Sequence, residues 1–290
     1  MPDQDEKNKV WSQMAEYQLS GIYIYPVKSL AGIRVERWKA EPTGLAYDRK
    51  WMLVDEDGLF LSQRKLPRMA LIKTALTGSE LVLSAPGMEP LTLSLLPSEG
   101  EWIDILVWND RCRARGVSGE ADLWFSRFLG QNCRLVFQPE ESIRSVNPDY
   151  GLPADQTSFS DGFPFLLVSE NSLAVLNREM GLDLPMARFR PNLVISGCRG
   201  YEEDTWREIR IGEIDFRLPK PCSRCAVPTI DPETAETGKE PLVTLNRTRK
   251  WQNKVYFGQN ALHDQCGELA VGDRVQIKTT GPRQPPFEPY

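Results

Sequence analysis

Two cysteines separated by two residues stand in the segment Lys220-Pro-Cys-Ser-Arg-Cys225, at the end of a strand-like run. Thiolate sulfur is a soft metal ligand. The neighbouring Lys220 and Arg224 supply positive charge that stabilises a thiolate or an anionic ligand. The segment therefore indicates a site for a thiophilic metal or an anionic cofactor.

The spacing of Cys222 and Cys225 leaves three interpretations open: a redox pair, half of a metal site, or two small buried residues. A thioredoxin-like pair sits at the start of a helix. Here Pro228 follows closely and opposes a helix interior. The redox-pair interpretation is therefore the weakest of the three.

A zinc site is a second possibility, because His263 and Cys266 could complete a tetrahedron with the two cysteines. It would use the only histidine of the chain. The long segment before His263 lacks the compactness of usual zinc modules. A lone histidine is also more often a surface or hydrogen-bonded core residue. A zinc-stabilised binding module stays open as an alternative.

Basic residues recur at the ends of the expected elements. Arginine binds phosphate oxygens in a bidentate manner, and backbone N–H groups of turns add donors. One surface cation is usually a solvated charge, so the set as a whole indicates a phosphorylated ligand. The set consists of Lys28, Arg49, Arg64, Arg68, Arg144, Arg188, Arg190 and Arg224.

The elements that must position these residues are mostly strands. Alternating apolar residues bounded by turn residues predict them. Apolar residues three and four apart predict two helices, one ending at Gly130 and one capped by Ser169. The expected strands and hairpins lie at 19–27, 51–61, 81–93, 102–108, 193–195 and 209–218, and the expected helices at 120–129 and 170–180. The fold class is therefore mainly β (α+β).

The length of 290 residues suggests two domains. Proline, glycine and polar residues interrupt the apolar pattern between about residues 135 and 160, where we place the boundary. The expected division is a mobile lead-in at 1–17, domains at 18–140 and 141–280, and a C-terminal tail at 281–290.

Composition restricts the partners and the compartment. The formal net charge of −5 argues against nucleic acid or an anionic membrane as partner. Six cysteines are too few for a disulfide scaffold. The polar N-terminus lacks a secretory apolar core, and no window reaches the length of a membrane span. We therefore expect a cytoplasmic protein without a membrane partner.

Five motifs in this order resemble the MOSC-domain molybdoenzymes, including the mitochondrial amidoxime-reducing component and its bacterial counterparts. The resemblance extends over most of the chain. It implies a MOSC N-terminal β domain at 18–140 and a MOSC β-barrel domain with a few helices at 141–280. The motifs are Tyr25-Pro-Val-Lys-Ser29, Asp48-Arg-Lys-Trp51, Asp161-Gly-Phe-Pro-Phe165, Arg188-Phe-Arg-Pro-Asn192 with Ile195-Ser-Gly-Cys198, and Cys222-Ser-Arg-Cys225.

The resemblance implies a molybdenum cofactor, a molybdopterin carrying oxo-molybdenum, with Cys225 as the metal ligand and catalytic residue. Cys222 and Cys198 would then be supporting residues. Pyridoxal phosphate is not expected. The implied cofactor-binding residues are Lys28, Ser29, Arg49, Asp161, Gly162, Phe163, Arg190, Asn192, Ser223, Arg224 and Cys225. Asn260 stands where some relatives carry an aromatic residue that touches the cofactor.

The implied activity is reduction of small N-hydroxylated substrates, namely amidoximes, hydroxylamines and N-hydroxylated bases. The sequence has no Cys-x4-Cys-x2-Cys run of the ferredoxin type. Electrons are therefore expected from a separate protein of the ferredoxin, flavoprotein or cytochrome b5 type. Asp161 and Asp231 are candidate proton donors, and the sequence does not choose between them. A carrier of molybdenum cofactor or sulfur, without turnover of its own, is the alternative within the same family.

Overall fold

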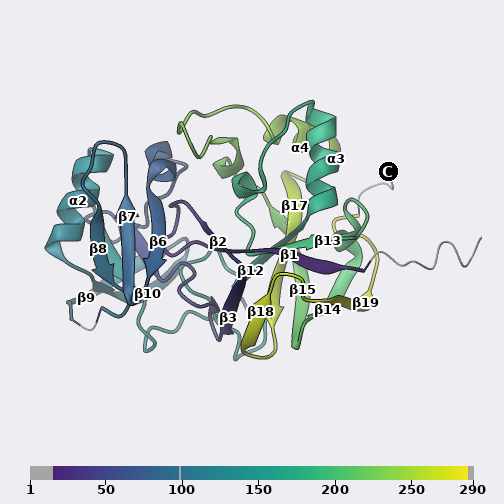
Figure 1. The fold of residues 1–290 in the computed structure, drawn as a ribbon, viewed down its shortest axis with the longest axis horizontal. Helices are drawn as coiled ribbons and strands as arrows, with labels where there is room; N and C mark the ends of the chain where they lie inside the picture. The colour runs from purple at the N-terminus through teal and green to yellow at the C-terminus, as the bar shows by residue number, and fades with distance from the viewer. Residues whose placement is uncertain (1–15, 98, 287–290) are drawn as a thin grey trace, which may run out of the picture.

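The computed structural model describes residues 16–97 and 99–286. Strands dominate it and helices are few, so the mainly β prediction is confirmed. Figure 1 shows the large sheet on one side of the molecule, with β3 and β18 beside it, and β6 to β10 with α2 on the other side. Residues 1–15 of the expected lead-in and 287–290 of the expected tail lie outside the described residues. Residues 281–286 run back toward β14, where Gly281 N–H donates to the carbonyl oxygen of Thr205.

The largest sheet has nine strands and joins segments from both ends of the described chain. β12 and β13 are parallel and are connected through α3 (Glu170–Met180), whereas the other neighbours are antiparallel. The strand order is β19 (Val275–Thr280), β14 (Trp206–Ile211), β15 (Ile214–Ser223), β17 (Lys254–His263), β12 (Phe165–Ser169), β13 (Leu193–Ser196), β1 (Gln18–Ile24) and β2 (Ile33–Val35), and β16 (Lys250–Trp251) pairs with β17.

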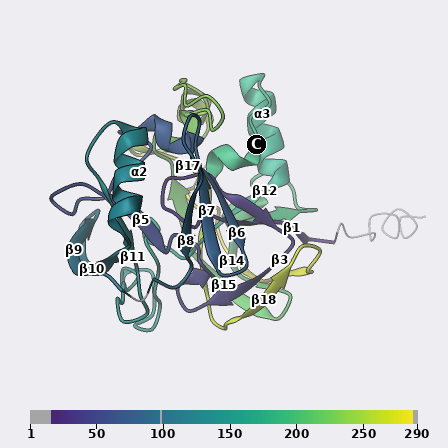
Figure 2. The same ribbon diagram turned by 60° about the vertical axis from the view of Figure 1, so that its left-hand side comes forward.

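Three smaller sheets complete the fold. Figure 2 shows β6, β7 and β8 side by side, near the helix α2 (Gly119–Leu129). The sheets are β5 (Trp51–Val54), β11 (Arg134–Phe137), β10 (Asp110–Gly116) and β9 (Trp102–Val107); β6 (Lys73–Thr77), β7 (Glu80–Ser84) and β8 (Leu91–Ser94); and β18 (Gly267–Ala270), β3 (Arg37–Glu41) and β4 (Gly44–Leu45).

The hairpins predicted at 81–93 and 209–218 are confirmed as β7–β8 and β14–β15. Gly212 has a φ of 56° in the turn of β14–β15, a conformation that glycine adopts without strain. In the hairpin predicted at 51–61, Val54 forms an antiparallel bridge with Phe60, but residues 59–61 do not belong to a regular strand.

Both predicted helices are confirmed, with the predicted cap Ser169 and the predicted end at Gly130, and the structure adds Ser118 as the cap of the first. The Ser118 side chain accepts a hydrogen bond from Ala121 N–H at the start of α2, and Gly130 ends the helix in a left-handed conformation. Ser169 caps α3 through Ser172 N–H, and Gly181 ends it in the same way. The remaining helical segments of the described residues are α4 (Leu242–Thr248) and the 3-10 turns η1 (Pro67–Leu71), η2 (Met186–Phe189), η3 (Glu202–Thr205) and η4 (Val227–Thr229).

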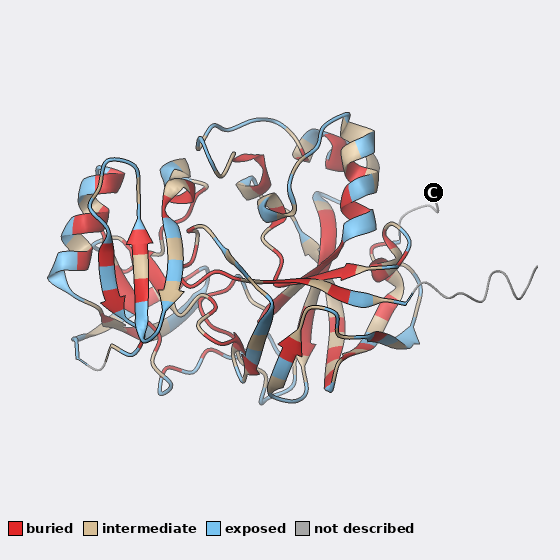
Figure 3. Cartoon of the chain, in the orientation of Figure 1, coloured by how far each residue is buried: buried red, intermediate tan, exposed pale blue. Residues whose placement is uncertain are grey.

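Two large hydrophobic cores underlie the sheets. One surrounds Trp51 and Phe125 beneath α2, and the other surrounds Trp206 and Phe216 within the large sheet. Figure 3 shows buried and exposed residues alternating along the strands, as sheets with one covered face require. β1 belongs to the core of the large sheet, although Val27 just after it packs in the core around Trp51. The domain division at 140/141 stays a prediction.

Within the described ranges, no helix combines the length and the apolar composition needed to cross a bilayer.

Candidate cofactor site

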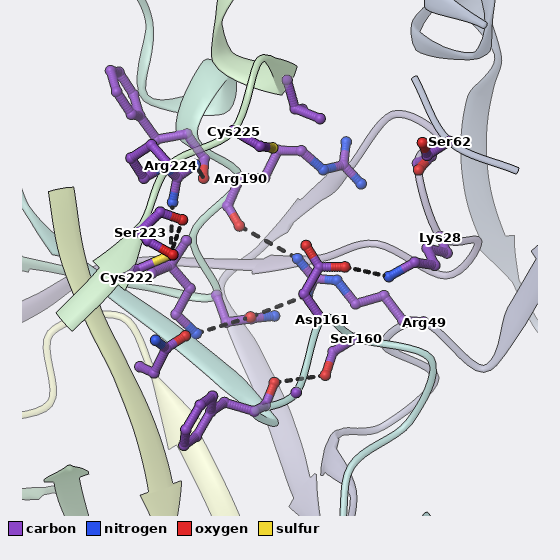
Figure 4. Close-up of a pocket in the computed structure, with 18 of the residues that line it drawn as sticks. Lys28, Arg49, Ser62, Ser160, Asp161, Arg190, Cys222, Ser223, Arg224 and Cys225 are labelled. Carbon is purple, nitrogen blue, oxygen red and sulfur yellow. Dashed lines mark hydrogen bonds and ion pairs between the residues drawn. The ribbon is translucent and has the colours of Figure 1, made fainter. Parts of the chain in front are cut away.

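A cavity gathers loops from distant parts of the chain. Its lining includes all eleven residues predicted to bind a cofactor. Figure 4 shows side chains from several separate segments around this space, with the cysteine motif on one side and Lys28 on the other. The eleven are Lys28, Ser29, Arg49, Asp161, Gly162, Phe163, Arg190, Asn192, Ser223, Arg224 and Cys225.

The segments that carry Lys28 and Arg49 are joined by backbone hydrogen bonds. Lys28 N–H donates to the carbonyl oxygen of Trp51 over 2.8 Å, and Arg49 N–H donates to that of Tyr25 over 2.8 Å. Ser29 and Arg49 have φ values of 69° and 51°. Such values are uncommon outside glycine and cluster at functional sites, where the surrounding structure enforces them.

Lys28 is a buried cation with two close partners. Its Nζ lies 2.7 Å from the carbonyl oxygen of Phe159 and 2.6 Å from Asp161 Oδ1. Burial lowers the pKa of Lys28 to about 8, although the Asp161 carboxylate opposes this shift. Near neutral pH the ammonium is therefore charged and sits against the cavity.

Asp161 is the carboxylate of the cavity lining. Desolvation by its neighbours opposes its charge, but Lys28 and the Trp108 indole N–H, 3.1 Å from Oδ1, outweigh this effect. They hold the pKa of Asp161 well below its usual range. Asp161 is therefore ionised at neutral pH.

Asn192 and Arg49 form a second polar cluster. Arg49 Nη1 lies 2.5 Å from Asp48 Oδ2 and 3.1 Å from Asn192 Oδ1. The Asn192 amide also donates to the carbonyl oxygen of Tyr23 over 3.1 Å and accepts from Leu166 N–H over 3.2 Å. Asn192 thus ties β1 to the start of β12 and orients Arg49.

Arg190 follows η2 in a left-handed conformation with a φ of 56°. Its guanidinium lies 4.2 Å from the centre of the Tyr25 ring, and Arg49 lies 4.5 Å from the same ring. Burial lowers the pKa of Arg190 to about 10, so it still carries a full charge at neutral pH. Two guanidinium groups are thereby held close together on one buried tyrosine.

The cysteine motif begins at the end of β15 and is fixed by Arg224. Arg224 N–H donates to the carbonyl oxygen of Val255 over 2.8 Å, and Nη2 donates to that of Phe189 over 2.7 Å. Its Nη1 lies 3.2 Å from Cys222 Sγ. Burial raises the pKa of the Cys222 thiol, although Arg224 opposes the shift. Both cysteines line the cavity, and both are free thiols.

The charge of the lining suits an anionic ligand. Five cationic side chains line the cavity, against one carboxylate, Asp161. The Nε of Arg224 is buried and has no hydrogen-bond partner, which leaves a donor to be satisfied. The cations are Lys28, Arg49, Arg64, Arg190 and Arg224.

Comparison with known proteins identifies the family of the chain. Residues 16–132 match the MOSC N-terminal beta barrel domain, and residues 154–276 match the MOSC domain. Mitochondrial amidoxime-reducing component 1 of Homo sapiens is 36% identical over 280 residues, covering 88% of this chain and 81% of the relative. The chain belongs to the MOSC-domain family.

Two further relatives place it within that family. Mitochondrial amidoxime reducing component 2 of Rattus norvegicus is 33% identical over 277 residues, covering 89% of this chain and 82% of the relative. Molybdenum cofactor sulfurase of Homo sapiens is 32% identical over 273 residues, covering 86% of this chain but 30% of the relative. The MOSC chain thus matches the reducing components over most of their length and the sulfurase over a part.

The alternative zinc site is wrong for this MOSC protein. Phe216 of β15 pairs with His263 of β17, and Cys222 lies six residues further along β15, a distance of ~20 Å at the rise of a strand. His263 Nε2 instead lies 2.8 Å from the carbonyl oxygen of Glu41, and Cys266 is exposed. Among the described residues, no three His, Cys, Asp or Glu side chains form a group able to hold a metal.

Three of the basic residues predicted to face a ligand do not line the cavity. Arg68 lies over the Phe128 ring, and Arg188 pairs with Asp231 at 3.3 Å. Arg144 is buried, and its Nη1 donates to the carbonyl oxygens of Ser158 and Ser160. Arg144 therefore shapes the loop that carries Asp161 and does not face the ligand.

The structure adds lining residues that the motifs did not single out. Ser62 and Arg64 come from the loop after the 51–61 hairpin, and Ser160 donates through Oγ to the carbonyl oxygen of Phe163 over 2.7 Å. Asn260 stands at the position where the resemblance implied an aromatic residue in some relatives. It also lines the cavity, and its amide donates to the carbonyl oxygen of Pro221 over 3.4 Å. Of these, Arg64 carried a signal as a member of the basic set and Asn260 through the resemblance, whereas Ser62 and Ser160 carried none.

A wider open cavity of about 600 Å³ adjoins the first one. The two share Arg64, Asp161 and the segment Ser223–Cys225. Residues of α4 and of the β16–β17 hairpin form its outer wall. The additional lining residues are Trp108, Leu242, Asn246, Asn253, Lys254 and Val255. Cys225 thus lies between the cationic cavity and the open one.

Proposed function

We propose that this MOSC protein is a molybdenum cofactor-dependent reductase of N-oxygenated compounds such as amidoximes, hydroxylamines and N-hydroxylated bases. The observation that carries the proposal is the convergence of the cysteine motif and five cations on one cavity that opens beside Cys225. Relatives of similar length are named for the reduction of amidoximes.

The donor set fits a molybdopterin. Its phosphate and oxygen-rich pterin need several spaced cations and hydrogen-bond donors, and each hydrogen bond to a charged group contributes about 1.5–3 kcal/mol. Lys28, Ser29, Arg49, Arg190 and Asn192 would supply them from one wall. Ser223 and Arg224 would supply further donors from the cysteine motif, and Gly162 and Phe163 also line the cavity.

Cys225 is the proposed metal ligand. It lines both cavities, so a metal held by its sulfur would face the open one, where a substrate can arrive. Cys222 lines the inner cavity and contacts Arg224. We therefore assign metal binding to Cys225 and a supporting role to Cys222.

When bound, the cofactor supplies a redox-active metal centre for cleavage of the N–O bond. Overall, the substrate gains two electrons and two protons, the N–O bond breaks, an N–H bond forms, and the oxygen leaves as water. The residues of this chain hold the cofactor, orient the substrate beside Cys225, and admit water and protons through the open cavity.

Neither of the two carboxylates considered as proton donors is suited to that role. Asp161 is held ionised by Lys28 and Trp108. Asp231 accepts hydrogen bonds from Glu233 N–H and Thr234 N–H and pairs with Arg188, which lower its pKa. A carboxylate ionised at working pH cannot donate a proton, so we propose that protons enter from solvent through the open cavity.

The electrons are proposed to come from a separate reduced protein. A ferredoxin or cytochrome b5 type donor supplies one electron in each encounter, so each turnover needs two encounters. A flavoprotein hydroquinone can supply both.

The test is turnover with a chemical reductant. Protein loaded with molybdenum cofactor, given dithionite and an aryl amidoxime, should form the amidine, and the Cys225→Ser variant should not. The same assay is run with a hydroxylamine, which should give the amine, and with an N-hydroxylated base, which should give the free base. If the loaded wild-type protein reduced none of the three substrates, the proposal would be overturned.

A cofactor or sulfur carrier is the second candidate, favoured by the match to molybdenum cofactor sulfurase. It predicts transfer of cofactor or sulfur to an apo-enzyme without turnover of N-hydroxylated compounds. Incubating loaded protein with a cofactor-free molybdoenzyme and measuring the recovery of that enzyme's activity separates the two candidates.

A further inference from the structure

The mouth of the open cavity carries a group of cations, which we call the basic rim: Arg64, Lys250 and Lys254. Arg64 and Lys254 line the open cavity directly. Lys250 pairs with Val255 across the β16–β17 hairpin, and cross-strand partners share a face, so Lys250 faces the same side as a lining residue. Arg247 of α4 is not part of the rim, because its Nη2 donates to the carbonyl oxygen of Glu179 on α3 over 3.0 Å.

One carboxylate lies at the mouth: Asp161 lines the open cavity, and it is already paired with Lys28. The sequence from Pro241 to His263 contains no Asp or Glu, in a chain whose formal net charge is −5. Within the part of the chain that the structure describes, no ion pair joins a carboxylate to any of the three rim cations. Lys250 and Lys254 are exposed. The mouth is therefore a local region of positive charge on an acidic molecule.

Exposed apolar side chains accompany the rim. Trp108 at the cavity wall is 40% exposed, and Trp251 beside Lys250 is 38% exposed. Val243, which follows the lining residue Leu242 on α4, is 54% exposed. A small apolar group surrounded by charge is the composition of a protein–protein contact.

We propose that the basic rim is the docking surface for an acidic electron-transfer protein. This inference rests on the proposed function and identifies the chemistry of its redox partner. A donor bound on the rim covers the open cavity and brings its redox centre over Cys225, next to the proposed metal. Short-lived redox complexes use small, charged interfaces, in which complementary charge accelerates encounter.

The location also implies an order of events. Because the same mouth admits the substrate, the donor and the substrate bind in turn. Two molecules of a reduced one-electron donor, or one flavoprotein hydroquinone, dock and depart before the N-oxygenated compound enters. The expected steady-state pattern is ping-pong, with competition between the two at high concentration of either.

The experiment compares two reductants on the loaded protein. The probe is a reduced plant-type [2Fe–2S] ferredoxin of net negative charge, freed of dithionite, and its oxidation is followed by stopped flow. The test variant is Lys250→Glu. The matched control is Arg127→Glu on α2, which is exposed and lies on a part of the molecule away from α4 in Figure 1.

Ferredoxin oxidation by the wild type should slow as ionic strength rises, because the Debye length shrinks to about 3 Å at 1 M. The rim variant should lose about tenfold or more in rate at low salt, whereas the control should lose little despite the same change in net charge. Turnover with dithionite should be unchanged in both variants. The salt dependence is measured on the wild type, so this part of the test remains valid even if a variant folds poorly.

Three outcomes would overturn the proposal: a wild-type rate that does not depend on salt, equal losses in rim and control variants, or no electron transfer from the acidic donor. These outcomes leave dithionite-driven turnover intact. Loss of dithionite-driven turnover in the wild type would instead refute the proposed function itself.

Discussion

Lys28 Nζ lies 2.6 Å from Asp161 Oδ1, although the two residues are 133 positions apart in the chain. This pair joins the turn after β1 to the loop before β12, and both side chains line the candidate cofactor site. The Lys28 side chain is 6% exposed and that of Asp161 is 65% exposed, so solvent screens the pair from the side of Asp161 only.

The pair should stabilise the cofactor-free protein. Asp161→Asn leaves the Lys28 ammonium with the Phe159 carbonyl but no counter-ion. Because Asp161 is largely exposed, we expect a coupling of only about 1 kcal/mol in a double-mutant cycle with Lys28→Met. Urea unfolding of the four proteins measures it. Strictly additive effects would show that the two residues do not interact in solution.

The two cysteines of the motif should behave differently. Cys225→Ala should retain pterin and lose turnover, because it removes the proposed metal ligand. Cys222→Ala should retain measurable turnover, because it removes a thiol that contacts Arg224. Pterin content and dithionite-driven turnover of both variants give the comparison. Equal loss in both would point to a dithiol site and contradict the assignment.

His263 should titrate below its ordinary pKa of 6.5. Burial lowers the pKa, with the hydrogen bond to Glu41 opposing the shift. The unfolded chain therefore binds a proton between the two pKa values while the folded chain does not, so stability falls as pH drops below 6.5. The single histidine makes the NMR assignment direct. A measured pKa of His263 at or above 6.5 would contradict this account. A smaller loss of stability at low pH in the wild type than in His263→Gln would contradict it as well.

Gly258 of β17 should not tolerate a side chain. Its φ is 79°, and an added Cβ would lie 2.8 Å from the carbonyl oxygen of Leu167. Gly258→Ala should lower the free energy of unfolding by more than about 1–2 kcal/mol, the cost of the left-handed conformation alone. Gly119→Ala, at the start of α2 with open space around it, is the control and should be neutral or stabilising. Similar thermal stability of both variants would refute the strain argument.

Local elements could be predicted because their signals are local. Ser169 caps its helix through the next turn, and Gly130 and Gly181 end the two helices. The eleven residues that meet in the cavity could be named because a set of ordered motifs carried them. Their meeting was implied by the resemblance and not by periodicity, since no local pattern tells how far apart Lys28 and Cys225 lie.

The long-range arrangement of the elements leaves no comparable local signal in the sequence. The pairing of β1 with β13 depends on contacts between residues such as Ile22 and Leu193, which sequence patterning cannot match. Arg144 was grouped with ligand-facing cations because its charge is visible in the sequence, but its burial against Ser158 and Ser160 is not. His263 was a plausible zinc ligand until the register of β15 and β17 separated it from Cys222.

The central claim is that this site holds a molybdenum cofactor through Cys225. The most direct measurement is the content of molybdenum, zinc and released pterin per chain, after purification from a host that makes the cofactor. The account predicts near-stoichiometric molybdenum and pterin in the wild type, and pterin with reduced molybdenum in Cys225→Ala. Zinc without pterin in the wild type, or equal molybdenum in both proteins, would contradict it.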